Sequence, residues 1–272
     1  MTPEFEQIRA EPAYAKVAAA LMERILDRTL RDGDRLPSET ELARQFGVNR
    51  STVREAVREL QSNGLLARRR GSKLLVVTRP GADHVAEGVS RALVLHDVTY
   101  LDVWEALTIL EPPIAQTAAR RRTDADLALI AAAASTFAAD NTDTARAASH
   151  AAEFFRIVGA ATHNRILMLA HEPLLQLLEP SLRGMMDKVP QSRARIVTAQ
   201  RRITDALRDQ DIDTAGTWMS RHIRDFRKGY ELARIDVRAV RAAADHSGSP
   251  SQRNGRRLAA SSRRVRPALT LV

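Results

Sequence analysis

The sequence has no cysteine, few aromatic residues and no long hydrophobic run. Without cysteine, the chain can form no disulfide bond, zinc–thiolate site or thiol nucleophile. No apolar stretch approaches the roughly 20 residues that a transmembrane helix needs, and the start MTPEFEQIRAEPAYAK lacks the pattern of a signal peptide. We therefore expect a soluble, cytoplasmic protein without a membrane partner.

The composition and the charge distribution favour a helical protein with two domains. Aromatic residues make up only 4% of the 272 residues, and alanine is abundant. Residues 1–80 carry 15 Lys/Arg against 11 Asp/Glu, residues 81–236 carry 19 against 21, and residues 237–272 carry 8 against 1. Because only the two ends are basic, we expect contact with nucleic acid at one end of the chain.

Residues 36–77 have the pattern of a winged helix-turn-helix. Ser38 and Glu41 are spaced as a capping box ahead of a short amphipathic helix. Gly47 then allows the chain to leave that helix with a positive φ. A second helix follows, with an apolar stripe at i, i+3, i+4 and i+7. The stripe consists of Val53, Ala56, Val57 and Leu60. Two helices joined in this way are typical of proteins that lay the second helix in the major groove of DNA.

The other face of the second helix carries the residues that would read DNA. Arg50, Arg54 and Arg58 are four residues apart and line up along one side. Arginine can donate two hydrogen bonds to the O6 and N7 atoms of guanine. We assign Arg50 and Arg54 to bases and leave Arg58 as a phosphate contact or a solvated side chain. Asn49 or Ser51 caps this helix. The predicted DNA-binding residues of the helix are Asn49, Arg50, Ser51, Thr52 and Arg54.

A basic hairpin follows the second helix. Short apolar strands at residues 65–67 and 74–77 flank the turn RRRGSK. In this turn Arg70, Gly71 and Lys73 are predicted to contact phosphates or enter the minor groove, whose negative potential attracts arginine. The alternative is a solvated surface turn.

The remaining sequence predicts a helical bundle between two irregular ends. The divisions are a flexible arm at 1–12, the winged domain at 13–77, a linker at 78–82, a helical domain at 83–236 and a disordered basic tail at 245–272. Helices are predicted over 84–95, 100–122 with a kink at its prolines, 124–139, 144–161, 164–178 with a break near Pro173, 181–189, 193–210 and 212–232. The fold class is thus mostly α: a winged helix-turn-helix with a small β-wing, followed by an all-α bundle. The tail adds non-specific DNA affinity or has no role.

The first half resembles the GntR family of bacterial transcription regulators. The stretch LPSE-x-x-LA-x-x-x-GV-x-R-x-TVREA-x-x-x-L-x-x-x-G-L is that family's signature. Thr40 stands where the FadR-type branch commonly has a DNA-contacting arginine, which implies that one contact is weaker or replaced; Thr40 is kept as a DNA-binding candidate. From residue 84 to about 232 the chain resembles the ligand-sensing, dimer-forming bundle of the same branch. The matching motifs are Leu110-Glu111-Pro112, Glu153-Phe154, Asn164, Ile203 and Arg221-His222.

The resemblance implies a metal site that this chain has lost. Many members of the branch hold a divalent metal with one aspartate and three histidines, and these positions correspond to Ala151, Phe155, Gln200 and His222. Alanine and phenylalanine cannot ligate a metal, and one histidine with one glutamine is a poor site. We therefore predict no metal and no other cofactor.

The same positions define the predicted effector pocket. Its residues are Leu107, Phe155, Gln200 and His222. Leu107 replaces a basic residue that often faces the effector in the branch. Three possibilities remain: a larger apolar or acyl-type effector, a small acid bound by arginines that the sequence does not locate, or no effector at all. His222 can also be read as a hydrogen-bonded core residue. His150, His163 and His171 are read as surface or capping residues.

Together these observations predict a bacterial transcription regulator. We expect a homodimeric repressor, associated with the nucleoid, that binds double-stranded DNA at a near-palindromic operator and is controlled by an unknown small-molecule effector. An enzyme would need a nucleophile with a base, paired carboxylates or a metal, and the helical half has no recognisable motif of this kind. The other alternative is a DNA-binding dimer without a functional effector pocket, constitutive or architectural.

Overall fold

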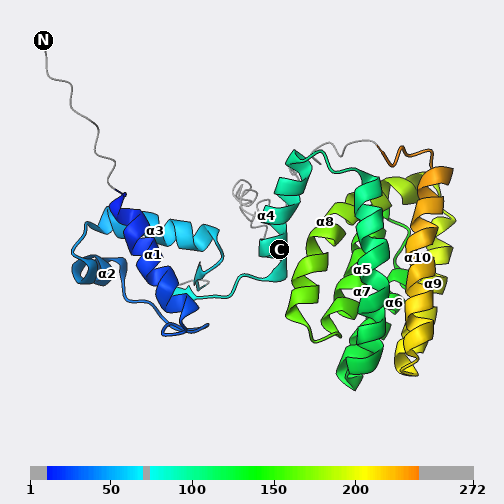
Figure 1. Cartoon of the computed structure of the whole chain (residues 1–272), viewed down its shortest axis with the longest axis horizontal. Coiled ribbons are helices and arrows are strands. Elements are labelled where there is room, and N and C mark those ends of the chain that lie inside the picture. The colour runs from blue at the N-terminus through cyan, green and yellow to red at the C-terminus, as the bar shows by residue number, and fades with distance from the viewer. Residues whose placement is uncertain (1–10, 70–73, 239–272) are drawn as a thin grey trace, which may run out of the picture.

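The computed structural model describes residues 11–69 and 74–238, which form two lobes (Figure 1). The N-terminal lobe contains α1 (Ala13–Leu26), α2 (Glu39–Phe46), α3 (Arg50–Ser62), β1 (Leu66–Arg68) and β2 (Leu75–Val77). The helical lobe contains α4 (Ala82–Leu95), α5 (Tyr100–Arg121), α6 (Asp124–Ala139), α7 (Thr144–Ala160), α8 (Arg165–Lys188), α9 (Ser192–Arg208) and α10 (Ile212–Leu232). The predicted fold class, a winged helix-turn-helix followed by an all-α bundle, is confirmed. None of the described helices is both long and apolar enough to span a membrane.

The N-terminal lobe is held together by one small apolar core. The predicted stripe of α3 is completely buried, and α1 packs against it through Val17, Ala18 and Leu21. β1 and β2 pair antiparallel, with Leu66 opposite Val77 and Arg68 opposite Leu75. The core therefore fixes α3 from behind and leaves its opposite face in solvent.

The turn between α2 and α3 forms as predicted, but the capping box at its start is incomplete. Gly47 has a φ of 66°, and the N–H of Val48 donates to the carbonyl of Ala43 at 3.0 Å. Ser38 Oγ accepts from the N–H of Glu41 at 3.2 Å. The Glu41 carboxylate does not return this bond. It accepts two hydrogen bonds from Arg44 instead, at 2.6 and 3.0 Å, because the guanidinium one turn away is the stronger donor.

The helical lobe is a bundle in which α5 packs against α7, α8, α9 and α10. Its core consists mainly of alanine, leucine and isoleucine, and the largest fully buried side chains include Phe137, Phe154, Phe155 and Phe226. Complete capping boxes start α5, at Thr99 and Asp102, and α6, at Thr123 and Asp126. These caps fix where each helix begins and therefore which residues face the core.

The prediction of a break near Pro173 is wrong. A single helix, α8, runs from Arg165 to Lys188 through Pro173 and Pro180. Each proline removes one backbone hydrogen bond, but buried side chains on both sides of Pro173 hold the helix against the core. These side chains include His171 and Glu172 before the proline and Leu175, Leu178 and Leu182 after it. The prolines of α5 likewise lie inside one helix from Tyr100 to Arg121.

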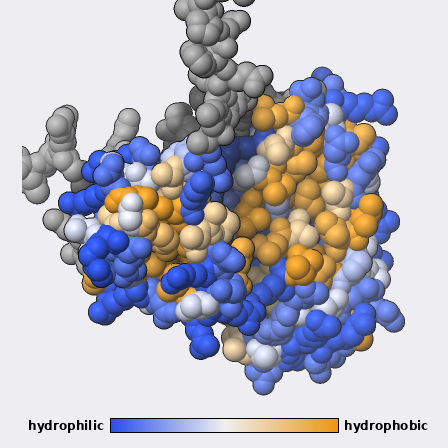
Figure 2. Space-filling view, turned by 60° about the vertical axis from the view of Figure 1, so that its left-hand side comes forward, coloured by the Kyte–Doolittle hydropathy of each residue, from blue (hydrophilic) through white to orange (hydrophobic). Residues whose placement is uncertain are grey.

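The helical lobe also presents a broad hydrophobic face (Figure 2). α8 packs against both α4 and α5, and all three helices expose apolar side chains. We call these exposed side chains the apolar face; it includes Val85 and Val89 of α4, Ile109 of α5 and Ile166 of α8. Ile109 and Ile166 are 71% and 72% exposed. Apolar surface that extends over several elements commonly marks an interaction site.

Candidate DNA-binding and effector sites

The exposed face of α3 carries the side chains that were predicted to read DNA. Arg54 and Arg58 are exposed on this face and Ser51 is exposed at its start, whereas Thr52 is half-buried. Asn49 is the N-cap residue of α3, but its side chain makes no capping hydrogen bond. Asn49 is itself exposed, so its amide is free of the helix that it precedes.

A carboxylate ties the start of α3 to the wing. Glu39 Oε1 accepts from Arg68 at 2.9 Å, and Glu39 Oε2 lies 3.6 Å from Arg50 Nε. The Glu39 side chain is only 12% exposed, so water screens these pairs less than it screens a surface salt bridge. We call this group the Glu39 clamp. It joins the first residues of α2 and α3 to the end of β1, and the Arg50 side chain remains 69% exposed.

The remaining residues that were predicted to contact DNA are Thr40 in α2 and Arg70, Gly71 and Lys73 in the wing. Thr40 is exposed in the first turn of α2, directly after Glu39. Arg70, Gly71 and Lys73 lie outside the described residues, and their contact with DNA stays a prediction. The Glu39 clamp was not predicted, because Glu39 and Arg68 are 29 residues apart in the sequence and meet only in the folded lobe.

In the helical lobe, two of the four positions aligned with the metal ligands form an aromatic stack. The ring of Phe155, on α7, lies parallel to that of His222, on α10, with centroids 5.3 Å apart. Phe226 contacts the imidazole from the same helix at 4.7 Å. Burial in this apolar surrounding lowers the pKa of His222 to about 3, so the imidazole is neutral at physiological pH.

These residues do not fit a metal ion. Ala151 and Phe155 offer no donor atom, and the phenyl ring covers one face of the His222 imidazole. Gln200 is fully buried, and neither its Oε1 nor its Nε2 has a hydrogen-bond partner in the described part of the chain. Within the same residues, no three His, Asp or Glu side chains are grouped as a metal site. Leu107 is also fully buried.

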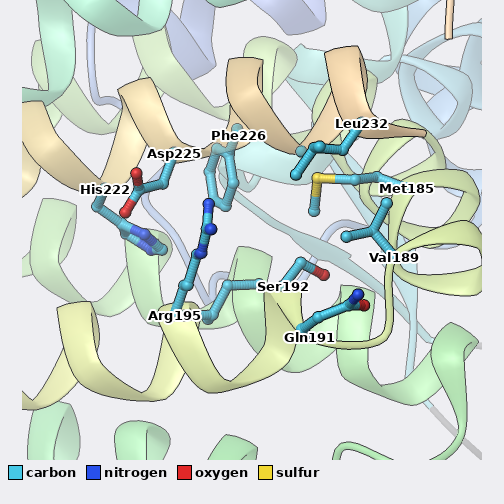
Figure 3. A pocket seen from close by; sticks show the side chains of 11 residues that line it. Met185, Val189, Gln191, Ser192, Arg195, His222, Asp225, Phe226 and Leu232 are labelled. Carbon is cyan, nitrogen blue, oxygen red and sulfur yellow. The ribbon is translucent and has the colours of Figure 1, made fainter. Parts of the chain in front are cut away.

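A small pocket lies beside this stack, where the end of α8 meets the start of α9 and the second half of α10. Its lining residues are Met185, Val189, Gln191, Ser192, Arg195, Ile196, His222, Asp225, Phe226, Gly229 and Leu232 (Figure 3). Of the four residues predicted for the effector pocket, only His222 lines it. Ser192 and Arg195 were missed. In the sequence, Pro190 follows the end of α8. A proline just after a helix indicates that the helix ends there, and this was the one signal that a new helix begins at Ser192.

Outside this stack, the burial of His171 differs from its prediction. It was expected at the surface but is 2% exposed, and its Nδ1 lies 3.1 Å from Oε1 of the fully buried Glu111. It is buried where α8 packs against α5, the helix that carries Glu111. Gly159 allows this, since a Cβ there would come within 2.6 Å of the imidazole Nε2. His163 is exposed and bonded to Asp126, in accord with its prediction.

The buried imidazole of His222 should make stability depend on pH. In the unfolded chain this histidine takes up a proton below its ordinary pKa of 6.5, whereas in the folded chain it resists protonation to about pH 3. The free energy of unfolding should therefore fall as the pH is lowered from 7 towards 4, with a contribution of up to about 1.4 kcal/mol per pH unit. Urea titrations across this range measure the slope.

The matched variant is His222→Phe, which keeps an aromatic ring in the stack but cannot bind a proton. Its stability should depend less on pH than that of the wild type, whereas His96→Gln, at an exposed position after α4, should leave the dependence unchanged. Equal slopes for the wild type and His222→Phe would contradict the assignment.

Comparison with known proteins agrees with both lobes. The chain matches the family model "Bacterial regulatory proteins, gntR family" over residues 13–76 and the FCD domain model over residues 102–225. It is similar to the HTH-type transcriptional repressor NanR of Salmonella newport (strain SL254), at 28% identity over 225 residues, which span 79% of this chain and 86% of that protein. For NanR of Salmonella arizonae the identity is 27%, and the match spans 79% and 85% of the two chains.

Among solved structures, Streptococcus agalactiae GntR shares 27% identity with a TM-score of 0.54, and the match covers 79% of this chain and 99% of that chain. The gntR model covers the N-terminal lobe, and the FCD model covers the helical lobe. The chain therefore belongs to the GntR family of bacterial regulatory proteins and is a DNA-binding transcription regulator rather than an enzyme, with an FCD domain in its helical half.

Proposed function

We propose that the protein is a homodimeric repressor that binds a near-palindromic operator and changes its DNA affinity when a small molecule occupies the helical lobe. The observation that carries this proposal is the exposed arginine face of α3, fixed from behind by an apolar core and from the side by the Glu39 clamp. A rigid reading face of this kind suits base recognition in the major groove. The repressor assignment is supported by the relatives, which are named as repressors.

Dimerisation is supported by the apolar face of the helical lobe. A near-palindromic site is read by two copies related by a two-fold axis. A second copy of this chain is the occupant that would cover α4, α5 and α8 and also supply the second recognition helix. The DNA-binding surface in the other lobe then stays free.

Control by a metal-bound effector is not part of the proposal. The aromatic stack of Phe155 and His222 stands where relatives in the resemblance hold their metal, so we propose a sensing domain without a metal and an effector with an apolar part. Leu107 and Gln200 would support the stack from within the core. We also propose that the protein acts in the cytoplasm, at the nucleoid, because it binds DNA.

The DNA-binding part is tested by selecting sequences from a randomised duplex pool with the full-length protein. The wild type should enrich an inverted repeat. Arg54→Ala should bind that repeat roughly tenfold or more weakly and lose its preference at one position of each half-site, because a bidentate arginine–guanine contact is worth about 1–3 kcal/mol. Arg58→Ala is the control on the same helix face.

Arg58→Ala should enrich the same repeat as the wild type, with affinity lowered uniformly or unchanged. If Arg54→Ala enriched the wild-type repeat with equal affinity, the assignment of Arg54 to a base would be wrong. Binding of the wild type without any sequence preference would instead favour an architectural protein.

The dimer is tested by placing a charge on the apolar face. Ile166→Lys should fold, because this side chain is 72% exposed in the monomer, but it should sediment as a monomer at micromolar concentration, where the wild type is a dimer. Burying an unpaired ammonium group in an interface is strongly unfavourable. Leu129→Lys is the control: Leu129 is 58% exposed on α6, which packs against α7 and α9. A dimeric Ile166→Lys protein would place the interface elsewhere.

A further inference from the structure

We infer that the outer side of α9 and α10 binds the phosphate backbone of a second segment of double-stranded DNA, separate from the segment that α3 reads. The inference goes beyond operator binding and effector control, and it uses neither the small pocket nor the apolar face. Four cationic side chains carry it, and we call them the basic face: Arg202 of α9 and Arg221, Arg224 and Lys228 of α10.

The cations of α10 form a single row. Arg221, Arg224 and Lys228 are three and four residues apart, so they lie on one side of the helix, and all three are exposed. At a rise of about 1.5 Å per residue the row is roughly 10 Å long, with one cation per turn. The buried side of α10 packs against α5 and α9. The row therefore faces solvent.

Trp218 joins the cation of α9 to this row. The Cζ atom of Arg202 lies 5.7 Å from the centroid of the Trp218 ring, and the Cζ atom of Arg221 lies 5.0 Å from it. Cation–π contacts of this kind hold a guanidinium near the ring without neutralising its charge. The cations of two helices thus meet on one surface.

The charge of the basic face is not neutralised by nearby carboxylates. Within the described part of the chain, none of its four side chains forms an ion pair. Asp205 and Glu231 pair with arginines outside the basic face, at 2.6 and 3.2 Å. Asp225 is half-buried in the wall of the small pocket, where Arg195 also lies. Exposed cations of one sign that remain unpaired attract a polyanion.

The chemistry and the spacing of the basic face suit DNA phosphates. Three of its four cations are arginines, whose planar forks can donate two parallel hydrogen bonds to one phosphate. Cations that repeat once per helical turn, about 5–6 Å apart, present a regular series of charges to the regular series of phosphates on a strand. A protein held at its operator by α3 is also surrounded by other segments of the same DNA, at a high effective concentration.

The position of the basic face requires a separate duplex segment. α9 and α10 lie at the edge of the helical lobe farthest from α1, α2 and α3 (Figure 1). The apolar face belongs to α4, α5 and α8, so a second copy docked there leaves the basic face free. A protein bound through α3 would therefore hold two segments of DNA together.

A bridging assay with the full-length protein tests the inference. A biotinylated duplex that the winged lobe binds, such as the inverted repeat selected above, is saturated with protein and washed, and a fluorescent duplex without the repeat is then added. The wild type should capture the second duplex. The triple variant Arg221→Gln, Arg224→Gln and Lys228→Gln should capture it roughly tenfold less or worse, and the slope of log affinity against log salt should become shallower by about three, because three phosphate contacts are lost.

The matched control is the triple variant Arg120→Gln, Arg146→Gln and Arg183→Gln. It removes the same charge from exposed positions on α5, α7 and α8, and it should capture the second duplex as the wild type does. Both triple variants change only exposed side chains and should fold. Both should also bind the inverted repeat with the affinity of the wild type, because α3 is unchanged.

Three results would overturn the inference. Equal capture by the wild type and the basic-face variant would assign the bridging to a free winged lobe, which all three proteins retain. Equal losses in the two triple variants would reduce the effect to net charge. Intact binding of the inverted repeat without capture of a second duplex would overturn this inference alone, and the proposed operator binding would stand.

Discussion

Phe155 and His222 stack face to face, 5.3 Å apart, in the middle of the helical lobe, and Phe226 closes the cluster. This contact determines whether His222 is available to bind a metal ion. A phenyl ring occupies the space in front of the imidazole, so His222 is a neutral core side chain rather than a ligand. The bundle gains apolar contacts at a place where the resemblance implied a charged centre. Among the described residues, buried polar atoms without a partner remain at Ser192 and Arg193, at the start of α9, and inside the core at Glu111, Gln200 and His222.

The N-terminal lobe depends on a different kind of contact. An apolar core fixes the back of α3, and the Glu39 clamp fixes its start to the wing. The two lobes approach each other through α4. Ser90 of α4 donates to Gln176 of α8 at 3.0 Å, and Gly64, after α3, leaves room for the ring of His84 in α4. The end of α8 supplies Met185 to the pocket. A ligand that moved this end of α8 would act on the helix that supports α4.

Local signals in the sequence predicted most of the fold. The boundaries of α6 and α10 agree with prediction, because polar caps and apolar periodicity coincide there: Thr123 caps α6 and Asp211 caps α10. The stripe of α3 was also predicted residue by residue. The prediction at Pro173 was wrong because the sequence rule considers only the lost backbone hydrogen bond. In the fold, α8 also buries apolar side chains from Leu175 to Met186.

The sites were less predictable, since they form between distant segments. The replacement of the metal ligands was visible in the sequence, but the pocket was not. Ser192 looks like any first-turn serine until the end of α8 and the second half of α10 bury it. Glu39 and Arg68 look like separate surface charges until the wing folds back onto α2. In each case the signal is a tertiary contact that neither periodicity nor composition encodes.

The central claim is that this sensing lobe works without a metal, and elemental mass spectrometry of the purified full-length protein tests it most directly. The protein should be prepared without chelator and without a metal-binding tag. The account predicts far less than one zinc, nickel, manganese, iron or cobalt ion per chain. One metal ion per chain, lost on His222→Phe substitution, would contradict it and would mean that His222 is a ligand rather than part of an aromatic core.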